Sequence, residues 1–319
     1  MDGNNPEATR LTVVVPTFRR PDLLRGCVIA CGRQAVDESI SVEIVVVDNC
    51  PDGSARSVVD DLADGSAHPI LYVAEAEPGI SAARNAGLRQ ASGEFVAFID
   101  DDEVPAPNWL SCLVETARRF EADAVLGPVH PLDPLRGEAI ATWPRTGTVL
   151  GSTTVSPFWA RAGKAFPRLA TNNVLLRVAS RSVEGVRFDP RLGLTGGEDT
   201  VYFNTIIGRG AKLVSCLEAC VHEHIGSDRL TLGYALSRSF RGGQIISWAP
   251  MLAEPRSLLL TSTSMIVGLA QLPAFLALAA WSCVVGRDKR DHHLRRAAAA
   301  LGKLFWAAPF RFRAYGAAP

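Results

Sequence analysis

The strongest chemical feature of the sequence is the run of four consecutive acids at positions 100–103, directly after the apolar segment 94–99. Carboxylates this close repel one another and lose hydration when buried, so they need a counter-charge. A hard divalent cation that also binds phosphate oxygens supplies one, and carboxylate ligands suit Mg²⁺ or Mn²⁺. The alternative is a solvated turn. The preceding apolar segment and the nearby Pro105 and Pro107 favour the metal site.

A second acidic pair, Glu198-Asp199, follows Gly196-Gly197 and precedes a helical pattern. Acids at a helix start complement the helix dipole, which is one explanation of the pair. The other is catalytic, because a carboxylate held opposite a metal-bound diphosphate can deprotonate an acceptor hydroxyl. The pattern alone leaves both explanations open.

Two histidines, His222 and His224, flank Glu223 after another apolar run. Alternate residues of a strand point to the same side, so both imidazoles face one way. We assign His224 as the candidate third metal ligand beside Asp100 and Asp102. The alternative is an ordinary surface histidine.

Alternating segments position these residues. Runs rich in apolar and β-branched residues predict strands at 11–15, 42–47, 70–73 and 94–99, and helical patterns begin near Asp22, Gly79 and Thr200. This alternation predicts a parallel, doubly wound α/β sheet. Ligands of such sheets bind beyond the carboxyl ends of the strands. Thr17, Asp48 and the acids at 100–103 each follow a strand end and are therefore expected to share one cleft.

The segment 79–87 contains neither GxGxxG nor GxxxxGK[ST], so it supports no classical dinucleotide site or P-loop. Its small residues predict close packing of a helix on the sheet. Arg84 in this segment stays available to meet a nucleotide.

The composition indicates a folded protein and excludes several classes. The 319 residues are 47% hydrophobic, with 33 basic and 33 acidic residues, and this balance gives no support to nucleic-acid binding. The seven cysteines show no zinc-site spacing and are read as reduced thiols. The polar residues 1–10 predict a short disordered lead without a signal peptide.

The carboxy-terminal part is different in character. Residues 257–286 contain no charge, which exceeds the ~20 residues that cross a bilayer. Gln271 and Pro273 interrupt the middle, and the basic stretch 287–296 favours the cytosolic side. We expect a re-entrant or monotopic hairpin broken near Pro273. The alternative is two ordinary helices packed on the rest of the chain.

Taken together, the motifs resemble the family-2 inverting glycosyltransferases of the GT-A fold. The likeness covers roughly residues 10–245 and rests on the order and spacing of these segments: Val15-Pro-Thr-Phe-Arg-Arg20, Val46-Val-Asp-Asn49, Asp52-Gly-Ser54, Gly79-Ile-Ser-Ala-Ala-Arg-Asn-Ala-Gly87, Gly93-Glu-Phe-Val-Ala-Phe-Ile-Asp-Asp-Asp102, Asn108-Trp-Leu110 and Gly197-Glu-Asp199. Residues 221–225, Arg229 and 237–243 further resemble a subgroup that builds bacterial exopolysaccharide on lipid carriers.

The resemblance implies a doubly wound mixed sheet at 11–245. The change of composition near 245 and the charge-free segment predict a membrane-associating helical extension at 246–319. The resemblance also implies a nucleotide pocket, a metal-binding DxD motif and a catalytic ED motif. The implied roles are a pocket lining of Pro16, Thr17 and Arg19, a base contact from Asp48, and Arg84 and Asp101 near the nucleotide. Asp100 and Asp102 match the DxD acids, Asp199 the general base and Glu198 an acid nearer the acceptor, while Asn172 and Asn173 fall where the donor sugar is contacted.

The implied reaction moves a hexose from a nucleotide-diphosphate donor, UDP by family frequency, to a glycan or lipid-linked acceptor. It would take place at the cytoplasmic face of the membrane with Mg²⁺ or Mn²⁺. Two alternatives stay open. A nucleotidyltransferase would share the nucleotide site but normally carries a glycine-rich loop after the first strand, where Pro16-Thr-Phe-Arg19 stands. An inactive sugar-binding scaffold would not require Asp100, Asp102 and Asp199.

Overall fold

The computed structural model describes residues 9–132, 169–252, 256–285 and 289–312. The chain divides into two compact units. Within the described residues, the first, here the sheet unit, contains residues up to 132 together with 169–190 and 202–224. The second, here the helical unit, contains 191–201 and the residues from 225 onward.

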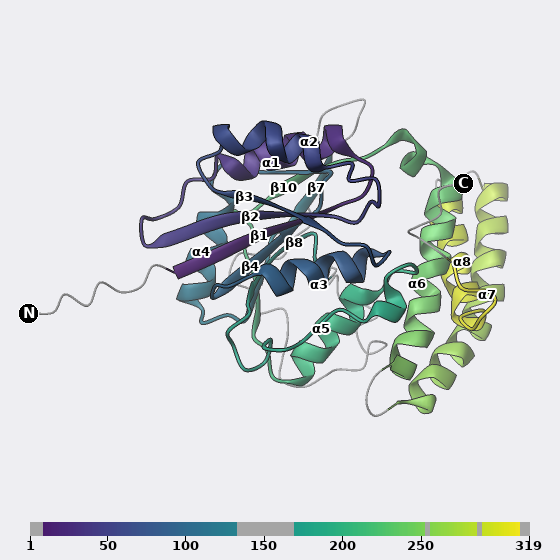
Figure 1. Ribbon diagram of the computed structural model, residues 1–319. Coiled ribbons are helices and arrows are strands. Elements are labelled where there is room, and N and C mark those ends of the chain that lie inside the picture. Colours follow the sequence, from purple (N-terminus) through teal and green to yellow (C-terminus); the bar gives the residue numbers. More distant parts are fainter. Residues whose placement is uncertain (1–8, 133–168, 253–255, 286–288, 313–319) are drawn as a thin grey trace, which may run out of the picture. The chain divides into compact units, whose positions relative to one another are not determined.

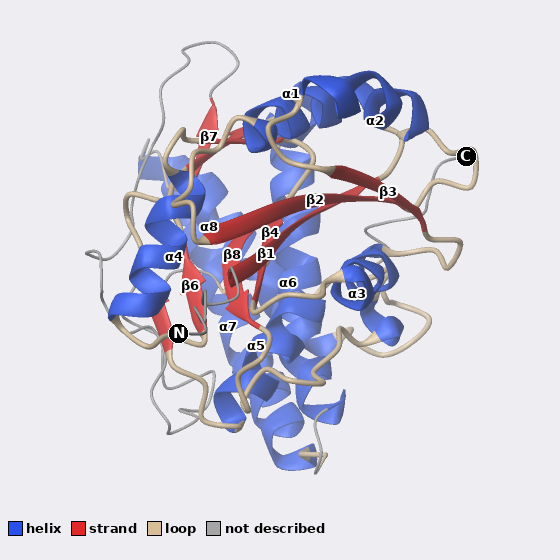
Figure 2. Ribbon diagram, turned by 60° about the vertical axis from the view of Figure 1, so that its left-hand side comes forward, coloured by secondary structure: helices blue, strands red, loops and turns tan. Residues whose placement is uncertain are grey.

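A seven-stranded mixed sheet is the frame of the sheet unit (Figure 2). Its strands, in spatial order, are β3 (Ile70–Ala74), β2 (Ile40–Asp48), β1 (Thr9–Thr17), β4 (Phe95–Ile99), β8 (Asn173–Arg177), β6 (Ala124–Leu126) and β9 (Leu213–Ser215). The first four pair in parallel, as predicted, whereas β8 is antiparallel to both β4 and β6. The antiparallel β8 makes the sheet mixed, which confirms the mixed sheet that the resemblance implied. The strand pattern alone indicated only parallel strands, because a buried apolar run has the same composition in either direction.

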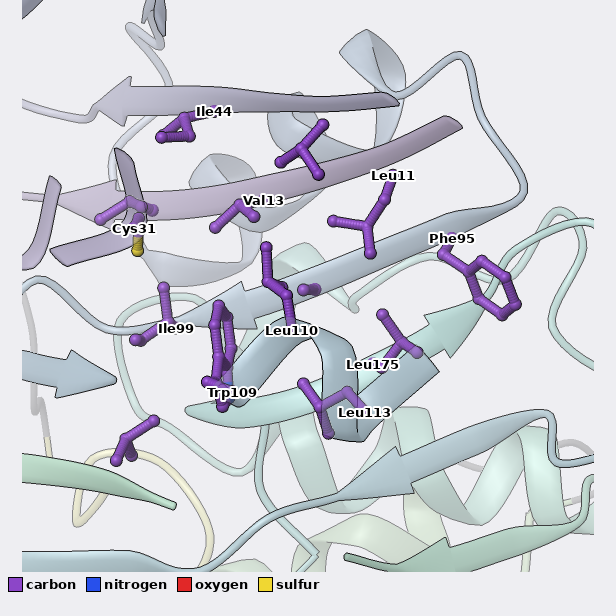
Figure 3. Packing of buried hydrophobic residues seen from close by; sticks show 14 of the residues in the cluster. Leu11, Val13, Cys31, Ile44, Phe95, Ile99, Trp109, Leu110, Leu113 and Leu175 are labelled. Atoms are coloured by element: carbon purple, nitrogen blue, oxygen red, sulfur yellow. The ribbon is translucent and has the colours of Figure 1, made fainter. Parts of the chain in front are cut away.

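Both faces of the sheet are buried, which explains the unbroken apolar run in β1. Val13 and Val15 belong to one core cluster together with residues of α4 (Trp109–Arg119), as Figure 3 shows for Val13, Trp109 and Leu110. Val14 faces the other cluster, with Ala83 of α3 (Ile80–Gln90). A Cβ on Gly87 of α3 would collide with the Val14 side chain. The predicted close helix–sheet packing is therefore confirmed.

Three further helices complete the sheet unit, α1 (Pro21–Gly32), α2 (Arg56–Leu62) and most of α5 (Glu198–Gly208). A small second sheet follows the acidic run. Its strands are β5 (Glu103–Pro105), β10 (Val221–His224) and β7 (Val129–Leu132), in that spatial order. Glu223 of β10 is opposite Glu103 of β5 in this sheet.

The helical unit contains α6 (Leu232–Leu252), α7 (Leu258–Val285) and α8 (Arg290–Leu304), which lie side by side (Figure 1). Position 245, where we expected the catalytic domain to end, falls inside α6, because the apolar character changes within one continuous helix. The expected break near Pro273 is wrong, since α7 continues through this residue. Residues 1–8 of the expected lead lie outside the described residues, and Thr9 and Arg10 already belong to β1.

Candidate active site

The carboxyl ends of β1, β2 and β4 meet at one edge of the sheet, because these strands are parallel neighbours. Thr17 is the last residue of β1, and the acidic run begins directly after β4. The Thr17 hydroxyl donates a buried hydrogen bond of 2.8 Å to Asp101 Oδ2. The structure thus brings Thr17 and the acidic run together, as the strand pattern predicted.

Two arginines face the three aspartates of this edge. Arg20, directly before α1, contacts Asp101 Oδ1 at 3.3 Å and Asp102 Oδ2 at 3.0 Å through Nη1. The buried Arg84 of α3 reaches Asp100 Oδ1 at 3.3 Å through Nη2. The side chain of Asp100 is 34% exposed and that of Asp102 only 7%. Asp100 is thus the more accessible carboxylate of the two DxD acids.

Glu103 stabilises the acidic run by accepting two hydrogen bonds. Its Oε2 accepts a hydrogen bond from the backbone N–H of Asp100 (3.0 Å), and its Oε1 accepts one from the Asn172 side chain (2.7 Å). Burial and the adjacent Asp100 carboxylate raise the pKa of Glu103 well above its usual range. Burial also raises the pKa of Asp101 to about 6, against the opposing effects of Arg20 and Thr17. Both shifts reflect chiefly the cost of burying a carboxylate.

Asp48 is wholly buried and organises the turn that follows β2. Its carboxylate accepts hydrogen bonds from the backbone N–H groups of Cys50 (3.0 Å) and Ala55 (2.7 Å) and from the Tyr72 hydroxyl (3.3 Å). The neighbouring Asn49 accepts a 2.7 Å bond from the backbone N–H of Gly79. Asp48 thus fixes the turn after β2, and its contact with a nucleotide base stays a prediction.

The start of α3 shows why the motif at 79–87 needs its particular residues. Gly79 has φ of 117°, a conformation that favours glycine. Asn85 exchanges two hydrogen bonds with the backbone of Phe188, at 2.8 and 2.9 Å. Arg84 lies between Gly79 and Asn85 in the sequence, and its guanidinium is 5.7 Å from the Phe188 ring centroid. These contacts hold Arg84 toward the acidic run.

Three other predicted pocket residues differ in their setting. Pro16 is buried within β1. Arg19 is exposed and pairs with the exposed Asp52 at 3.0 Å, away from the aspartates that Arg20 contacts. Asn173 is buried and uses its amide inside the fold. It accepts from Trp109 Nε1 and donates to the carbonyls of Pro128 and Ala219. The amide of Asn173 thus joins β8 to its surroundings, and its contact with the donor stays a prediction.

His224 lies next to the acidic run through its backbone, since its N–H donates to the carbonyl oxygen of Asp102 at 2.8 Å. Its side chain is exposed. Within the described residues, no three His, Cys, Asp or Glu side chains form a group that could hold a metal by themselves. Two carboxylates are a sufficient protein contribution where substrate phosphates and water complete the shell of Mg²⁺. Asp100 and Asp102 therefore remain the better candidate ligands.

The acid pair Glu198-Asp199 begins α5, and this first turn belongs to the helical unit. Gly196 and Gly197 precede it with φ of 78° and 97°, which side chains rarely adopt. A Cβ on Gly197 would also lie 2.8 Å from the Ile245 side chain. The glycines are thus required to place the acids at the helix start. The general-base role of Asp199 stays a prediction.

Comparison with known proteins identifies the family. The sequence profile of glycosyl transferase family 2 matches residues 12–143. The succinoglycan biosynthesis protein ExoM of Rhizobium meliloti is 34% identical over 291 residues, covering 91% of this chain and 90% of that protein. The chain belongs to glycosyl transferase family 2. A glucosyltransferase of Campylobacter jejuni named for a diphospho-undecaprenol-linked glycan is also similar, at 35% identity over 34% of this family-2 chain.

Solved structures confirm the GT-A fold of this glycosyltransferase. A mannosyltransferase from Pyrobaculum calidifontis, in complex with GDP-Man and Mn²⁺, superposes with a TM-score of 0.62 at 20% identity. The superposition covers 93% of this chain and 87% of the mannosyltransferase. TarS 1–349 of S. aureus in complex with UDP gives a TM-score of 0.54 at 16% identity, over 92% of this chain and 89% of that chain.

Sequence reasoning missed the roles of three residues. Arg20 was part of a matched motif without a role, yet it contacts two of the three aspartates. Its position after a strand end was the available signal. Asn49 and Glu103 each accept a hydrogen bond from a backbone N–H, that of Gly79 and that of Asp100. Such contacts leave no pattern in side-chain chemistry.

Proposed function

We propose that this glycosyltransferase transfers a sugar with inversion from a nucleotide-diphosphate donor to a hydroxyl of a glycan or lipid-linked acceptor. The observation that carries the proposal is the acidic edge of the sheet, where Thr17, Arg20 and Arg84 converge on the aspartates at 100–102. The names of relatives support it. One is a succinoglycan biosynthesis protein, and another is named for an undecaprenol-linked glycan.

The residues present fit a divalent cation. The acidic edge offers only oxygen ligands, its carboxylates are crowded, and burial raises the pKa of Asp101 to about 6. In this proposal Asp100 and Asp102 hold Mg²⁺ or Mn²⁺, with His224 as a third candidate. A bound cation would neutralise charge on the departing nucleoside diphosphate. The related structures that contain GDP-Man with Mn²⁺ or UDP support such a donor, and UDP is our first choice of nucleotide.

The remaining steps use residues of this chain. Arg84 and Arg20 orient the diphosphate by their positive charge. Asp199 accepts the proton of the acceptor hydroxyl as it attacks the anomeric carbon, and Glu198 lies nearer the acceptor. A single displacement inverts the configuration. The nucleotidyltransferase alternative loses its support with the family assignment.

A membrane location completes the proposal. We assign the chain to the cytoplasmic face, where a lipid-linked acceptor would be reached, with residues 246–319 as the membrane-associating extension. The support is α7, a helix of 28 residues that contains an 18-residue stretch with a mean hydropathy of 1.7, of which 17% is buried.

A panel of nucleotide sugars tests the function. The purified chain is incubated with each donor in the presence of Mg²⁺, Mn²⁺ or a chelator, and hydrolysis and thermal stabilisation are measured. We expect one nucleotide class to be hydrolysed only with metal. When Asp102→Asn is compared in the same assay, Asp60→Asn, at an exposed acid on α2, is the control for the loss of one negative charge. Metal-independent hydrolysis, or no binding of any nucleotide sugar, would contradict the proposal.

A further inference from the structure

The helix α7 buries small residues and exposes large apolar ones. Its buried residues are Thr261, Gly268, Ala279 and Ser282. Its exposed large apolar side chains, each at least 43% exposed, are Leu258, Leu259, Ile266, Leu269, Leu276, Leu278, Trp281, Val284 and Val285. This distribution is the reverse of a helix in a water-soluble bundle, which turns its large apolar side chains inward.

The contacts among the three helices follow the same rule. A Cβ on Gly268 of α7 would lie 2.9 Å from the carbonyl oxygen of Ala300 in α8, and one on Gly302 of α8 would collide with the backbone of Phe240 in α6. Hydroxyl groups add hydrogen bonds between the helices. Ser247 of α6 is bonded to Ser264 of α7 at 2.6 Å and donates to the carbonyl oxygen of Lys303 at 2.9 Å.

Close approach at small residues and hydroxyl bonds between helices are typical of packing in lipid, where apolar side chains gain nothing by turning inward. Trp248 is the large exception among the four buried residues of α6. In water, an apolar face of this extent would cost free energy and promote aggregation. The packing therefore points to acyl chains as the solvent of the α7 face.

The position of α8 decides how α7 meets the lipid. The two helices run antiparallel, with His293 against Phe275 (ring centroids 6.4 Å apart) and Lys303 Nζ bonded to Gln271 Oε1 at 2.7 Å. The guanidinium of Arg296 lies 5.0 Å from the Phe275 ring centroid. If α7 crossed a bilayer, these cations would lie along its middle, in the hydrocarbon region. Charged residues there are costly.

We propose that α6, α7 and α8 form a monotopic module that lies in one leaflet of an anionic phospholipid bilayer, with α7 parallel to the membrane plane. The exposed apolar side chains of α7 enter the acyl region. Basic residues at the start of α8 and within it, among them Lys289, Arg295 and Arg296, meet the lipid phosphates. The inference deepens the proposed function, since it rests on the membrane assignment made there.

Flotation of the full-length protein with vesicles tests the lipid partner. Vesicles of phosphatidylcholine alone are compared with vesicles that also contain phosphatidylglycerol, and we expect flotation chiefly with the latter. Ile266→Glu/Leu269→Glu should lower the bound fraction by at least about tenfold, because a carboxylate resists entry into acyl chains. The matched control is Leu71→Glu/Leu217→Glu, two exposed leucines of the sheet unit, which should float like the parent.

The charge contribution has its own pair of variants. Lys289→Gln/Arg295→Gln should weaken binding to the anionic vesicles by roughly fivefold for each removed cation, and leave binding to neutral vesicles unchanged. Arg33→Gln/Arg181→Gln, exposed cations of the sheet unit, should have no such effect. Equal binding of the parent to neutral and anionic vesicles would overturn the assignment of anionic lipid.

Spin labels test the orientation. Labels are attached one at a time at positions 259, 269 and 281, in a variant where the exposed Cys283 is replaced by serine. We expect equal, shallow depths at all three positions. A depth that reaches the bilayer centre at 269 would show a crossing and overturn the proposal. Donor hydrolysis is measured on the same samples, so a protein that hydrolyses donor but never floats refutes the membrane module alone.

Discussion

In β4 of the sheet unit every position from Phe95 to Ile99 is buried and apolar, whereas in α7 of the helical unit the buried positions hold Thr261, Gly268, Ala279 and Ser282. The sheet unit hides large side chains and places its charges at strand ends. The helical unit hides small and hydroxyl-bearing residues and exposes its large apolar ones. The two parts of one chain thus follow opposite burial rules, which agrees with the proposal that the first faces water and the second lipid.

The comparison has a consequence for function. The sheet unit can hold crowded carboxylates because its core is stabilised independently of them by two apolar clusters. The exposed face of α7 buries little apolar surface within the unit, and in our proposal lipid covers it. Substitutions should therefore separate chemistry, core stability and membrane binding.

The largest expected effect is on the core of the sheet unit. Phe98→Ala should lower the free energy of unfolding by about 3–5 kcal/mol, because Phe98 is buried and packs edge-on against Phe188 at 5.8 Å between ring centroids. Denaturant unfolding of the full-length protein measures it. A loss of less than about 1 kcal/mol, small for a buried phenylalanine, would contradict a water-type core.

Asp102→Asn should reduce metal-dependent donor turnover by about a thousandfold, the upper scale for removing a preorganised charge at an active site. The fold should persist, because neighbouring Asp101 keeps its bonds to Thr17 and Arg20. Turnover with Mn²⁺, Mn²⁺ affinity and circular dichroism are measured, with Asp60→Asn as control. Full activity of the variant would remove the metal assignment.

Asp199→Asn should lower the transfer rate by at least about a hundredfold, the scale of general acid–base catalysis. Nucleotide affinity should not change, since the proposed role is proton transfer. Single-turnover transfer and equilibrium nucleotide binding separate the two. Weak nucleotide binding with normal transfer at saturation would show that the role is wrong.

Gly302→Ala should destabilise the helical unit by roughly 1–3 kcal/mol, the range for overpacking, because its Cβ would meet the backbone of Phe240. Gly242→Ala on α6 is the control, since a Cβ there meets nothing within 4 Å. Hydrogen exchange of α6 and α8 reports the loss locally. Equal protection in the two variants would argue against small-residue packing.

The smallest effect should come from Ile266→Ala on the exposed face of α7. We expect a change in unfolding free energy within about 0.5 kcal/mol, because the side chain is 68% exposed. Vesicle binding should nevertheless fall. A stability loss like that of Phe98→Ala would show that this face packs against protein.

Much of the sheet could be predicted, because β1, β2 and β4 each contain an apolar run and are followed by or end in chemically distinctive residues such as Thr17 and Asp48. The direction of β8 could not, since Asn173-Val-Leu-Leu-Arg177 reads the same in either orientation. The short strands β6 and β9, three residues each, give no periodic signal.

The acidic part of the site was predictable, because four adjacent acids at 100–103 need counter-charge. In the structure Arg20 and Arg84 pair with Asp102 and Asp100 and provide part of this counter-charge. The burial of Asn173 was not predictable, because a buried amide and a ligand-binding amide have the same sequence signal. Pro273 was expected to break a helix that in fact continues, because a proline lowers helix stability only locally while the contacts with α8 extend along α7.

If Asp102 holds the metal as proposed, its bond to Arg20 would make the affinities of metal and donor interdependent. A cation that binds Asp102 must compete with the guanidinium, which then needs another anion. The donor diphosphate supplies that anion, so each ligand should bind more tightly in the presence of the other, with reciprocal coupling. The enzyme would thereby bind metal and donor together and bind metal alone only weakly. Asp102 would then rarely hold a cation in the absence of donor.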